Sequence, residues 1–416
     1  MIKNSEYPKI YQIAFLISMS CVLQISESLI PHPIPGLRLG LANIMTLVAL
    51  VTLGFGVALE VSTLRTILSS FIMGTFMSPT FILSFSAALI STLIMGFLYW
   101  LSTLHQRYRF TIVGISILGA LSHNLVQFYL AYFIFIRHKG IFIFLPWLCL
   151  GAVVMGWVTG LMAGSVCRRI KEIEGQETIT HRAQGEYCVL ELRDYSPGDS
   201  LIHRLGADIK IIGLFILSFT VLLTNNFWIY LFLILFLIMV VLVSKTSLNF
   251  IFSKIKKSAS FIFVSFLFPL FFNSGKYVFS NMTYFKITFE GLNTGAIFAF
   301  RLLFLVMASS LLIRNTSPKE LAEGMAKVLF PLRFVGISQK RIALIVSLSW
   351  MAIPVFWGIA RKAIGTAEFK KVKNLRNLIP RLTDIIAEFY LEREKVYALW
   401  EAEYEKARLL RKEVEN

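Results

Sequence analysis

Apolar segments long enough to cross a lipid bilayer recur along this chain, and they constrain its fold more than any other feature. Several windows exceed the roughly 18 apolar residues that a transmembrane helix requires. They fall into two groups, before residue 171 and after residue 207, on either side of a polar stretch. Charged residues make up 16% of the 416 residues, against about 25% in soluble domains. We therefore predict an all-α polytopic membrane protein built from two parts.

The net charge of +17 is explained by membrane topology. Lys3 and Lys9 precede the first apolar segment, and Arg168 and Arg169 follow the sixth. Cytoplasmic loops of membrane proteins carry an excess of Lys and Arg. We expect a multi-pass protein of the cell inner (cytoplasmic) membrane, with the N-terminus and the C-terminal helices in the cytoplasm. The expected partner of the basic residues is the lipid bilayer, not nucleic acid.

Ten spans fit this pattern. Six are predicted in the first part, near residues 10–30, 37–54, 58–77, 80–101, 110–136 and 141–167. Four are predicted in the second part, near residues 209–224, 227–243, 258–273 and 291–313. Residues 342–360 are apolar enough to span as well, but spanning would place Arg361 and Lys362 outside. We favour a helix packed in the bundle or at the cytoplasmic interface, with the spanning alternative left open.

Polar side chains inside apolar spans are costly, so each is a candidate functional residue. His123 and Gln127 share one helix face, with Asn124 close to it. Such groups line a pocket or hydrogen-bond neighbouring helices, and both interpretations stay open. The two arginines of the set favour an anionic group on the ligand. The substrate-binding candidates are Arg38, Asn43, Glu60, Arg65, His123, Asn124 and Gln127.

Sequence motifs for chemistry are missing from the chain. It has no G-x-x-x-x-G-K-[ST] phosphate loop and no aspartate-rich cluster of the kind that holds Mg²⁺. We therefore predict no catalytic residue, no cofactor and no metal site, and ATP hydrolysis would have to come from a partner. Ala14 and Ser18 form a small-x-x-x-small step, which permits close contact with another helix.

The segment Tyr195–Lys210, which reads YSPGDSLIHRLGADIK, resembles the opening of the transmembrane T component of energy-coupling-factor (ECF) transporters, the CbiQ/EcfT family. Further matches keep their spacing, namely Leu223–Trp228, Arg301, Thr316–Leu321, Pro331–Arg333 and Ile353–Pro354. The resemblance covers about 195–416. It implies transmembrane helices near 209–313 followed by cytoplasmic coupling helices near 316–412.

The first part resembles a different family. Pro35–Ile44, Ser78–Thr80 and His123–Gln127 are similar to the Gx transporter family, also labelled heptaprenyl diphosphate synthase component I. That family resembles the six-helix substrate-binding S components of ECF transporters. The resemblances imply an S-component-like membrane domain at 1–170, a polar cytoplasmic linker at 171–194 and a T-component-like domain at 195–416.

Together, the resemblances imply a fused membrane subunit of an ECF-type ABC importer. It would take up a small molecule of the vitamin, metal or precursor class, with ATP hydrolysed by two separate cytosolic ABC ATPase subunits. Ala14 and Ser18 are then candidates for the contact between the S and T parts. The alternatives are an accessory protein of isoprenoid metabolism and an ATP-independent carrier or scaffold.

T-family coupling helices usually end in two Ala-Arg-Gly motifs that contact the ATPases. By spacing from Pro354, the first motif falls here at Phe369-Lys370-Lys371 and the second at Ala402-Glu403-Tyr404. Lysine keeps the positive charge but loses the planar fork of arginine, and Glu403 reverses the charge. Arg408 lies further along and is a substitute. The candidates for ATPase contact are therefore Lys370, Lys371, Glu403 and Arg408.

Overall fold

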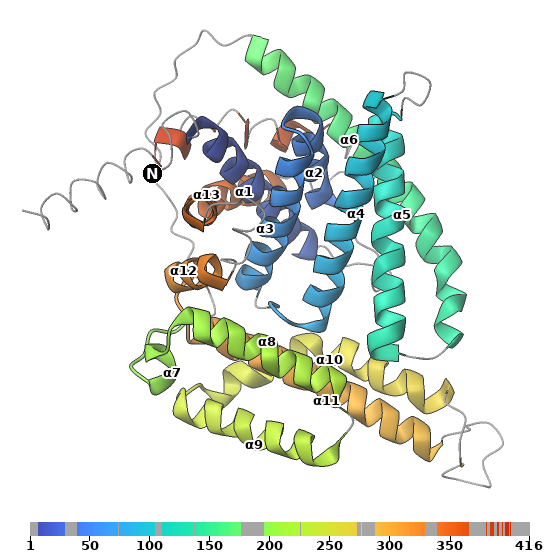
Figure 1. Ribbon diagram of the computed structural model, residues 1–416, viewed down its shortest axis with the longest axis vertical. Helices are drawn as coiled ribbons and strands as arrows, with labels where there is room; N and C mark the ends of the chain where they lie inside the picture. The colour runs from blue at the N-terminus through green and yellow to red at the C-terminus, as the bar shows by residue number, and fades with distance from the viewer. Residues whose placement is uncertain are drawn as a thin grey trace, which may run out of the picture.

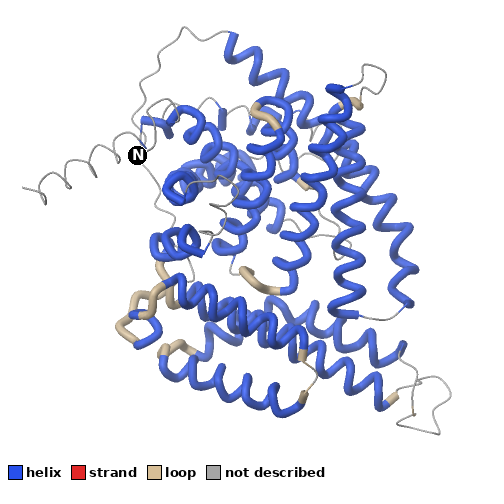
Figure 2. Tube along the Cα trace, in the orientation of Figure 1, coloured by secondary structure: helices blue, strands red, loops and turns tan. Residues whose placement is uncertain are grey.

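The computed structural model describes residues 7–29, 40–73, 75–104, 110–136, 139–175, 195–224, 226–272, 276, 288–328 and 339–365, together with residues 380, 383–386, 389–390, 393, 396–398 and 400 near the C-terminus. Helices dominate these residues (Figure 2). We call residues 7–175 the first half and the described residues from 195 onward the second half. The prediction of an all-α polytopic membrane protein is confirmed.

The first half contains six α-helices, a π-helical turn and a 3₁₀ turn. They are α1 Tyr7–Leu29, α2 Leu41–Thr52, α3 Phe55–Met73, α4 Pro79–Leu104, α5 Ile112–Leu130, η2 Ala131–Ile136, η3 Lys139–Phe144 and α6 Leu145–Gly175. Neighbours along the ring α1, α3, α4, α5, α6 and α2 contact one another, and α2 also packs on α3. The result is one closed six-helix bundle.

The second half begins with a short helix and four long ones, followed by two further helices. They are α7 Leu201–Arg204, α8 Ala207–Leu223, α9 Phe227–Val243, α10 Leu248–Phe272, α11 Phe289–Arg314, α12 Pro318–Val328 and α13 Gln339–Gly365. Helices α8 to α11 lie together as a layer across the lower part of Figure 1, whereas α2 to α5 run along its long axis. Helix α12 packs on α8, and α13 packs on α1.

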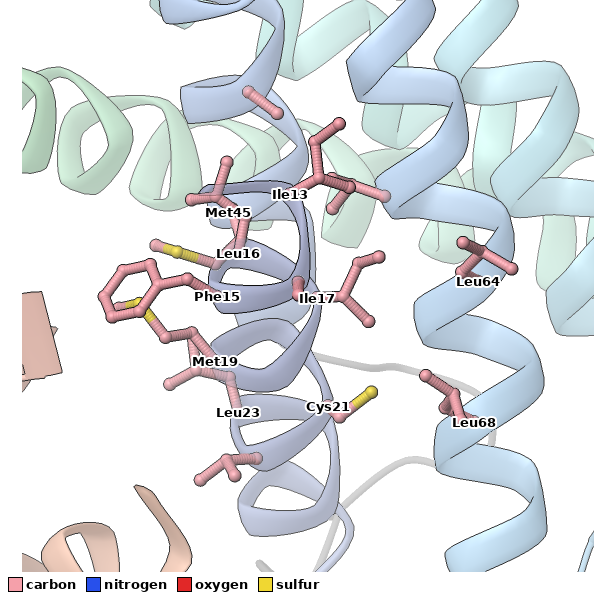
Figure 3. Close-up of a cluster of buried hydrophobic side chains, with 14 of the residues drawn as sticks. Ile13, Phe15, Leu16, Ile17, Met19, Cys21, Leu23, Met45, Leu64 and Leu68 are labelled. Carbon is pink, nitrogen blue, oxygen red and sulfur yellow. The ribbon is translucent and has the colours of Figure 1, made fainter. Parts of the chain in front are cut away.

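Helix α1 is the most deeply buried of the long apolar helices of the first half. Ile13, Ile17 and Cys21 are fully buried, because α1 is covered by α2 and α3 on one side and by α13 on another. Figure 3 shows Ile17 and Cys21 turned toward Leu64 and Leu68 of α3, while Phe15 projects from a different side of α1. The core of the first half therefore extends without interruption onto the second half.

Two predicted spans differ from the observed helices. The span at 37–54 becomes the 12-residue α2, bounded by Gly40 at φ 75° and Gly54 at φ 92°. Only glycine adopts this left-handed backbone readily, so α2 begins after Gly40 and ends before Gly54. Twelve residues reach about 18 Å, well short of the roughly 30 Å hydrocarbon core.

The span at 258–273 is instead the C-terminal part of α10, which starts ten residues earlier at Leu248. The ten added residues include Lys254, Lys256 and Lys257. Ile251 is buried, and Phe250 and Ile255 pack on the core formed by α8, α9 and α11. This apolar face keeps the basic segment helical. Helix α6 likewise continues through residues 171–175 of the predicted linker.

Seven helices among the described residues are long and apolar enough to cross a membrane. Five lie in the first half and two are Phe289–Arg314 and Arg341–Arg361 of the second half. Helices α2 and α9 are apolar but shorter. The length and hydropathy of Arg341–Arg361 allow spanning, yet much of this stretch is buried against α1.

Helices α5 and α6 approach closely along a stripe of glycines on α6. A Cβ atom at Gly156 would lie 2.7 Å from Ile117 Cα, and one at Gly160 would lie 2.7 Å from Val113 Cα. The next glycine at the same spacing, Gly164, has nothing within 4 Å of its Cβ position. The first two glycines therefore set the distance between α5 and α6, and the third does not.

We expect Gly156→Ala and Gly160→Ala each to destabilise the protein by about 1–3 kcal/mol, because the added methyl group meets backbone atoms that must move. Gly164→Ala is the matched control and should be neutral or slightly stabilising, since Ala is the better helix former. Thermal unfolding of the detergent-solubilised chain measures the difference. An equal loss for all three variants would contradict this packing.

Candidate functional site

Helices α1 and α13 make a reciprocal polar contact between the two halves. Ser18 Oγ lies 3.1 Å from the Ser349 carbonyl oxygen, and Ser349 Oγ lies 3.2 Å from the Ala14 carbonyl oxygen. Ala14, Ser18 and Ser349 are all fully buried. Each hydroxyl also donates to a carbonyl of its own helix. Small side chains let the backbones come this close, so both helices expose carbonyls that the opposite serine reaches.

Aromatic rings extend this contact to the segment near the C-terminus. Phe15 of α1 meets Phe356 of α13 at 5.3 Å and Tyr390 at 5.9 Å between ring centroids, both edge to face. Tyr11 lies 5.4 Å from Trp400. Edge-to-face and offset pairs of this kind are favourable beyond their buried area. Helix α1 therefore contacts both α13 and residues 390 and 400 near the C-terminus.

Trp400 also connects the last described segment to α13. Its Nε1 donates to the Leu348 carbonyl oxygen at 3.0 Å, and the side chain is almost fully buried. Phe389 packs on Phe356 at 5.3 Å. We use the term docking groove for the surface that α13 forms with residues 389, 390, 397 and 400 and that contacts α1.

A charged contact flanks the docking groove. Arg341 Nη2 of α13 lies 3.0 Å from Glu60 Oε2 of α3. The two side chains are 28% and 16% exposed, so water screens the pair less than it would a surface pair. The sequence suggested Glu60 for substrate binding, and the structure places its carboxylate beside Arg341 of the second half.

Three polar residues meet between α1, α2 and α3. Arg65 Nη2 donates to Asn43 Oδ1 at 2.6 Å, and Arg65 Nη1 donates to Gln24 Oε1 at 3.3 Å. Arg65 is 4% exposed. Two amide oxygens thus hold the guanidinium in a fixed orientation. The structure brings together two of the sequence-predicted residues and adds Gln24.

Glu27 closes the neighbouring end of α2. Its two carboxylate oxygens accept hydrogen bonds from the backbone N–H groups of Gly40 and Leu41 at 2.9 and 3.0 Å. A carboxylate at a helix N-terminus is stabilised by the unpaired N–H groups there. Glu27 therefore stabilises the start of α2 at Leu41.

The polar face of α5 contains one helix-to-helix bond and one bond within the helix. Asn124 Nδ2 donates to the Leu148 carbonyl oxygen of α6 at 3.2 Å. His123 Nε2 and Gln127 Nε2 are 3.2 Å apart, and since an amide nitrogen only donates, the histidine nitrogen accepts. Asn124 is thus used in helix packing, whereas His123 and Gln127 form a pair on one face, as their spacing predicted.

In the second half, Arg301 of α11 is buried at the end of α8. Arg301 Nη2 donates to the Thr224 carbonyl oxygen at 2.8 Å, and Arg301 Nε donates to Tyr230 Oη at 3.2 Å. Tyr230 Oη also donates to the Thr224 carbonyl at 2.6 Å. A cation beside the C-terminal carbonyls of a helix is favourable, so Arg301 ties α8, α9 and α11 together.

The opening motif of the second half packs on the end of α11. Lys210 Nζ donates to the Asn315 carbonyl oxygen at 2.9 Å, and the Ser196 amide donates to the Arg314 carbonyl at 3.1 Å. A Cβ at Gly324 of α12 would lie 2.7 Å from Ala207 Cβ. The motif thereby fixes α12 against α8, at the point where the chain leaves the four-helix layer for the docking groove.

Several candidates cannot be placed. Arg38, Lys370, Lys371, Glu403 and Arg408 lie outside the described residues. Within the described ranges, no three His, Cys, Asp or Glu side chains gather where a metal ion could bind.

Sequence reasoning missed Gln24, Ser349 and Arg341. Gln24 is a polar residue within a predicted span, and the rule that selected Asn43 would have selected it as well. Ser349 and Arg341 gave no such signal, because each becomes important only through a partner more than 250 residues away.

Two family models match the chain in separate regions. Residues 16–166 match the family described as heptaprenyl diphosphate synthase component I. Residues 198–367 match the family described as cobalt transport protein. The boundary between the matches falls in the polar stretch between α6 and α7.

The second half is also similar to curated proteins called energy-coupling factor transporter transmembrane protein EcfT. The relative from Streptococcus thermophilus is 31% identical over 216 residues, which cover 50% of this chain and 82% of that protein. The relative from Clostridium kluyveri is 27% identical over 226 residues, covering 51% of this chain and 82% of that protein.

We expect Glu60→Arg and Arg341→Glu each to weaken the contact between the halves, because each places two like charges together in a poorly screened site. The double variant, which reverses the pair, should restore most of the loss. The measurement uses the full chain with a protease site inserted between residues 185 and 186, and scores how much of the first half stays bound to the second after cleavage. If the double variant dissociates as readily as the single variants, the pair does not contribute to docking.

Proposed function

This chain belongs to the family of energy-coupling factor transporter transmembrane proteins, and we propose that it is a membrane subunit of an ECF-type importer in which the substrate-binding and coupling parts are fused. The family match and the apolar helices make it a multi-pass membrane component of such a transporter. The finer assignment concerns the first half, which we propose to be the substrate-binding part.

The observation that carries this proposal is the placement of α1 in the docking groove. Ala14 and Ser18, the small-residue step expected to meet the T part, lie against Ser349 of α13. The opening motif that resembles T components packs α12 against α8, and α12 also contacts α13. A substrate-binding bundle held on coupling helices is what the proposed function requires.

The orientation of the two halves also supports an importer. Helices α2 to α5 run crosswise to α8 and α11 (Figure 1). If α8 to α11 cross the membrane, the first half lies tilted over toward the membrane plane. In the mechanism that the family resemblance implies, the substrate-binding part tilts as the ATPases close. We propose that the structure represents this tilted state.

Substrate binding is proposed at the polar residues of the first half. Arg65, oriented by Asn43 and Gln24, is the candidate for an anionic group on the ligand. His123 and Gln127 are the candidates for neutral polar groups. Glu60 is reassigned to the contact between the halves, and Asn124 to packing of α5 on α6. Arg38 stays a candidate from sequence.

Two cytosolic ABC ATPase subunits are the proposed source of energy, since the chain has no phosphate-binding loop of its own. The proposed contacts are Lys370, Lys371 and Arg408, with Glu403 as a reversed charge that a dedicated ATPase would have to match. We propose that the N-terminus and these helices face the cytoplasm. Because the two parts are fused, we propose that each T part also keeps its own substrate-binding part in the docking groove.

The test is to purify the tagged full chain from its native membrane and identify the ATPases retained with it. We expect ATP-dependent uptake after reconstitution with those subunits. The amount of ATPase that copurifies with the variant Lys370→Glu/Lys371→Glu should fall at least about tenfold, because reversing a desolvated interface charge costs several kcal/mol. Lys276→Glu, a lysine after α10, is the matched control and should retain the ATPases normally.

Two results would contradict the proposal. One is prenyl-transfer activity of the purified chain in the absence of an ATPase, which would favour the isoprenoid alternative. The other is substrate accumulation in liposomes that continues without ATP hydrolysis, which would favour a carrier.

A further inference from the structure

A cluster of cations surrounds Phe250 where the four-helix layer of the second half ends. Arg314, the last residue of α11, places its guanidinium carbon 4.6 Å from the centroid of the Phe250 ring. Lys254, one turn further along α10, places its Nζ 5.4 Å from the same centroid. The ring attracts each cation through its negative face. Two cations are thus held beside one side chain.

The surrounding sequence is one-sided in charge. From residue 209 to residue 289 the chain contains no Asp or Glu. The same stretch supplies Lys245 in the α9–α10 turn and Lys256 on α10, both exposed. Among the described acidic residues, Asp208 at the start of α8 lies 3.6 Å from Lys327 of α12, on a different side of the layer. The α9–α10 corner is therefore a basic patch, defined by Lys245, Lys254, Lys256 and Arg314.

The basic patch borders an apolar surface. Leu242 at the end of α9 is 71% exposed, and Leu248 and Phe252 at the start of α10 are 63% and 66% exposed. Cations directly above exposed aliphatic and aromatic side chains are typical of the level where lipid headgroups meet acyl chains. A soluble anion would not need this apolar border, and a cytosolic protein would not cover it.

We propose that the basic patch binds the phosphate of an anionic phospholipid headgroup, with Arg314 and Lys254 as the principal contacts and Lys245 and Lys256 beside them. The acyl chains of this lipid pack along Leu242, Leu248 and Phe252. The bound lipid would hold the start of α10 and the end of α11 together. The site is independent of the substrate and of the ATPase contacts proposed above.

The experiment titrates the delipidated full chain with phosphatidylglycerol and, separately, with phosphatidylcholine, and follows bound lipid by native mass spectrometry. We expect selective binding of phosphatidylglycerol. Removing three charges with Lys254→Gln/Lys256→Gln/Arg314→Gln should weaken that binding on the order of 100-fold, given the contribution of each cation near an anionic headgroup. Phosphatidylcholine binding should not change.

Three comparisons make the result decisive. The milder Lys254→Gln/Lys256→Gln variant, which keeps Arg314 on Phe250, should still lose about tenfold or more, and its unfolding temperature in phosphatidylcholine shows that it is folded. Lys276→Gln, beyond the opposite end of α10, is the control and should bind as the unchanged chain does. Inorganic phosphate at millimolar concentration should not displace the lipid.

The proposal is overturned if the unchanged chain binds both lipids equally or if the triple variant keeps its affinity for phosphatidylglycerol. It is also overturned if inorganic phosphate competes fully, which would indicate a site for a free anion. Loss of the ATPases from the triple variant with phosphatidylglycerol binding intact would assign the patch to a protein partner instead.

Discussion

The close approach of α1 and α13 is the contact on which the arrangement of the two halves depends. Two serines and one alanine allow it, since each buried hydroxyl reaches a carbonyl of the opposite helix. Aromatic rings from α1, α13 and residues 390–400 then enclose the contact. Because α1 is also a member of the helix ring of the first bundle, its burial contributes to the packing of both halves. A change on this helix would disturb both the packing of the first bundle and its docking on the second half.

The two halves belong to one chain, so docking of the first half on the second is intramolecular. The effective concentration of each half around the other is therefore high, whatever the expression level. A weak contact is then sufficient to keep the halves together, and a weak contact would also be easier to rearrange in the proposed tilting mechanism. The half-buried Glu60–Arg341 pair is of this kind. It helps to fix the orientation of the two halves, which otherwise pack through apolar side chains.

Much of the fold followed from hydropathy, because long apolar segments leave few alternatives to helices in a membrane. The shortness of α2 did not follow, since it depends on left-handed backbone at Gly40 and Gly54 that hydropathy does not register. For the candidate site, helical spacing paired His123 with Gln127 and marked Ala14 and Ser18 as a contact surface. It could not supply Ser349, which is 335 residues from Ala14. The sequence marked Glu60 as a substrate-binding candidate, and it could not show that Arg341 would lie beside it.

The most direct test of the central claim is disulfide formation between α1 and α13 in native membranes. In a variant whose Cys21, Cys149, Cys167 and Cys188 are replaced by Ala, Ser18→Cys/Ser349→Cys should cross-link rapidly under mild oxidation, as side chains this close permit. Gln12→Cys/Ser347→Cys, on exposed faces of the same helices, should not. Cross-linking of the control pair at the same rate, or none of Ser18→Cys/Ser349→Cys, would show that α1 does not occupy the docking groove.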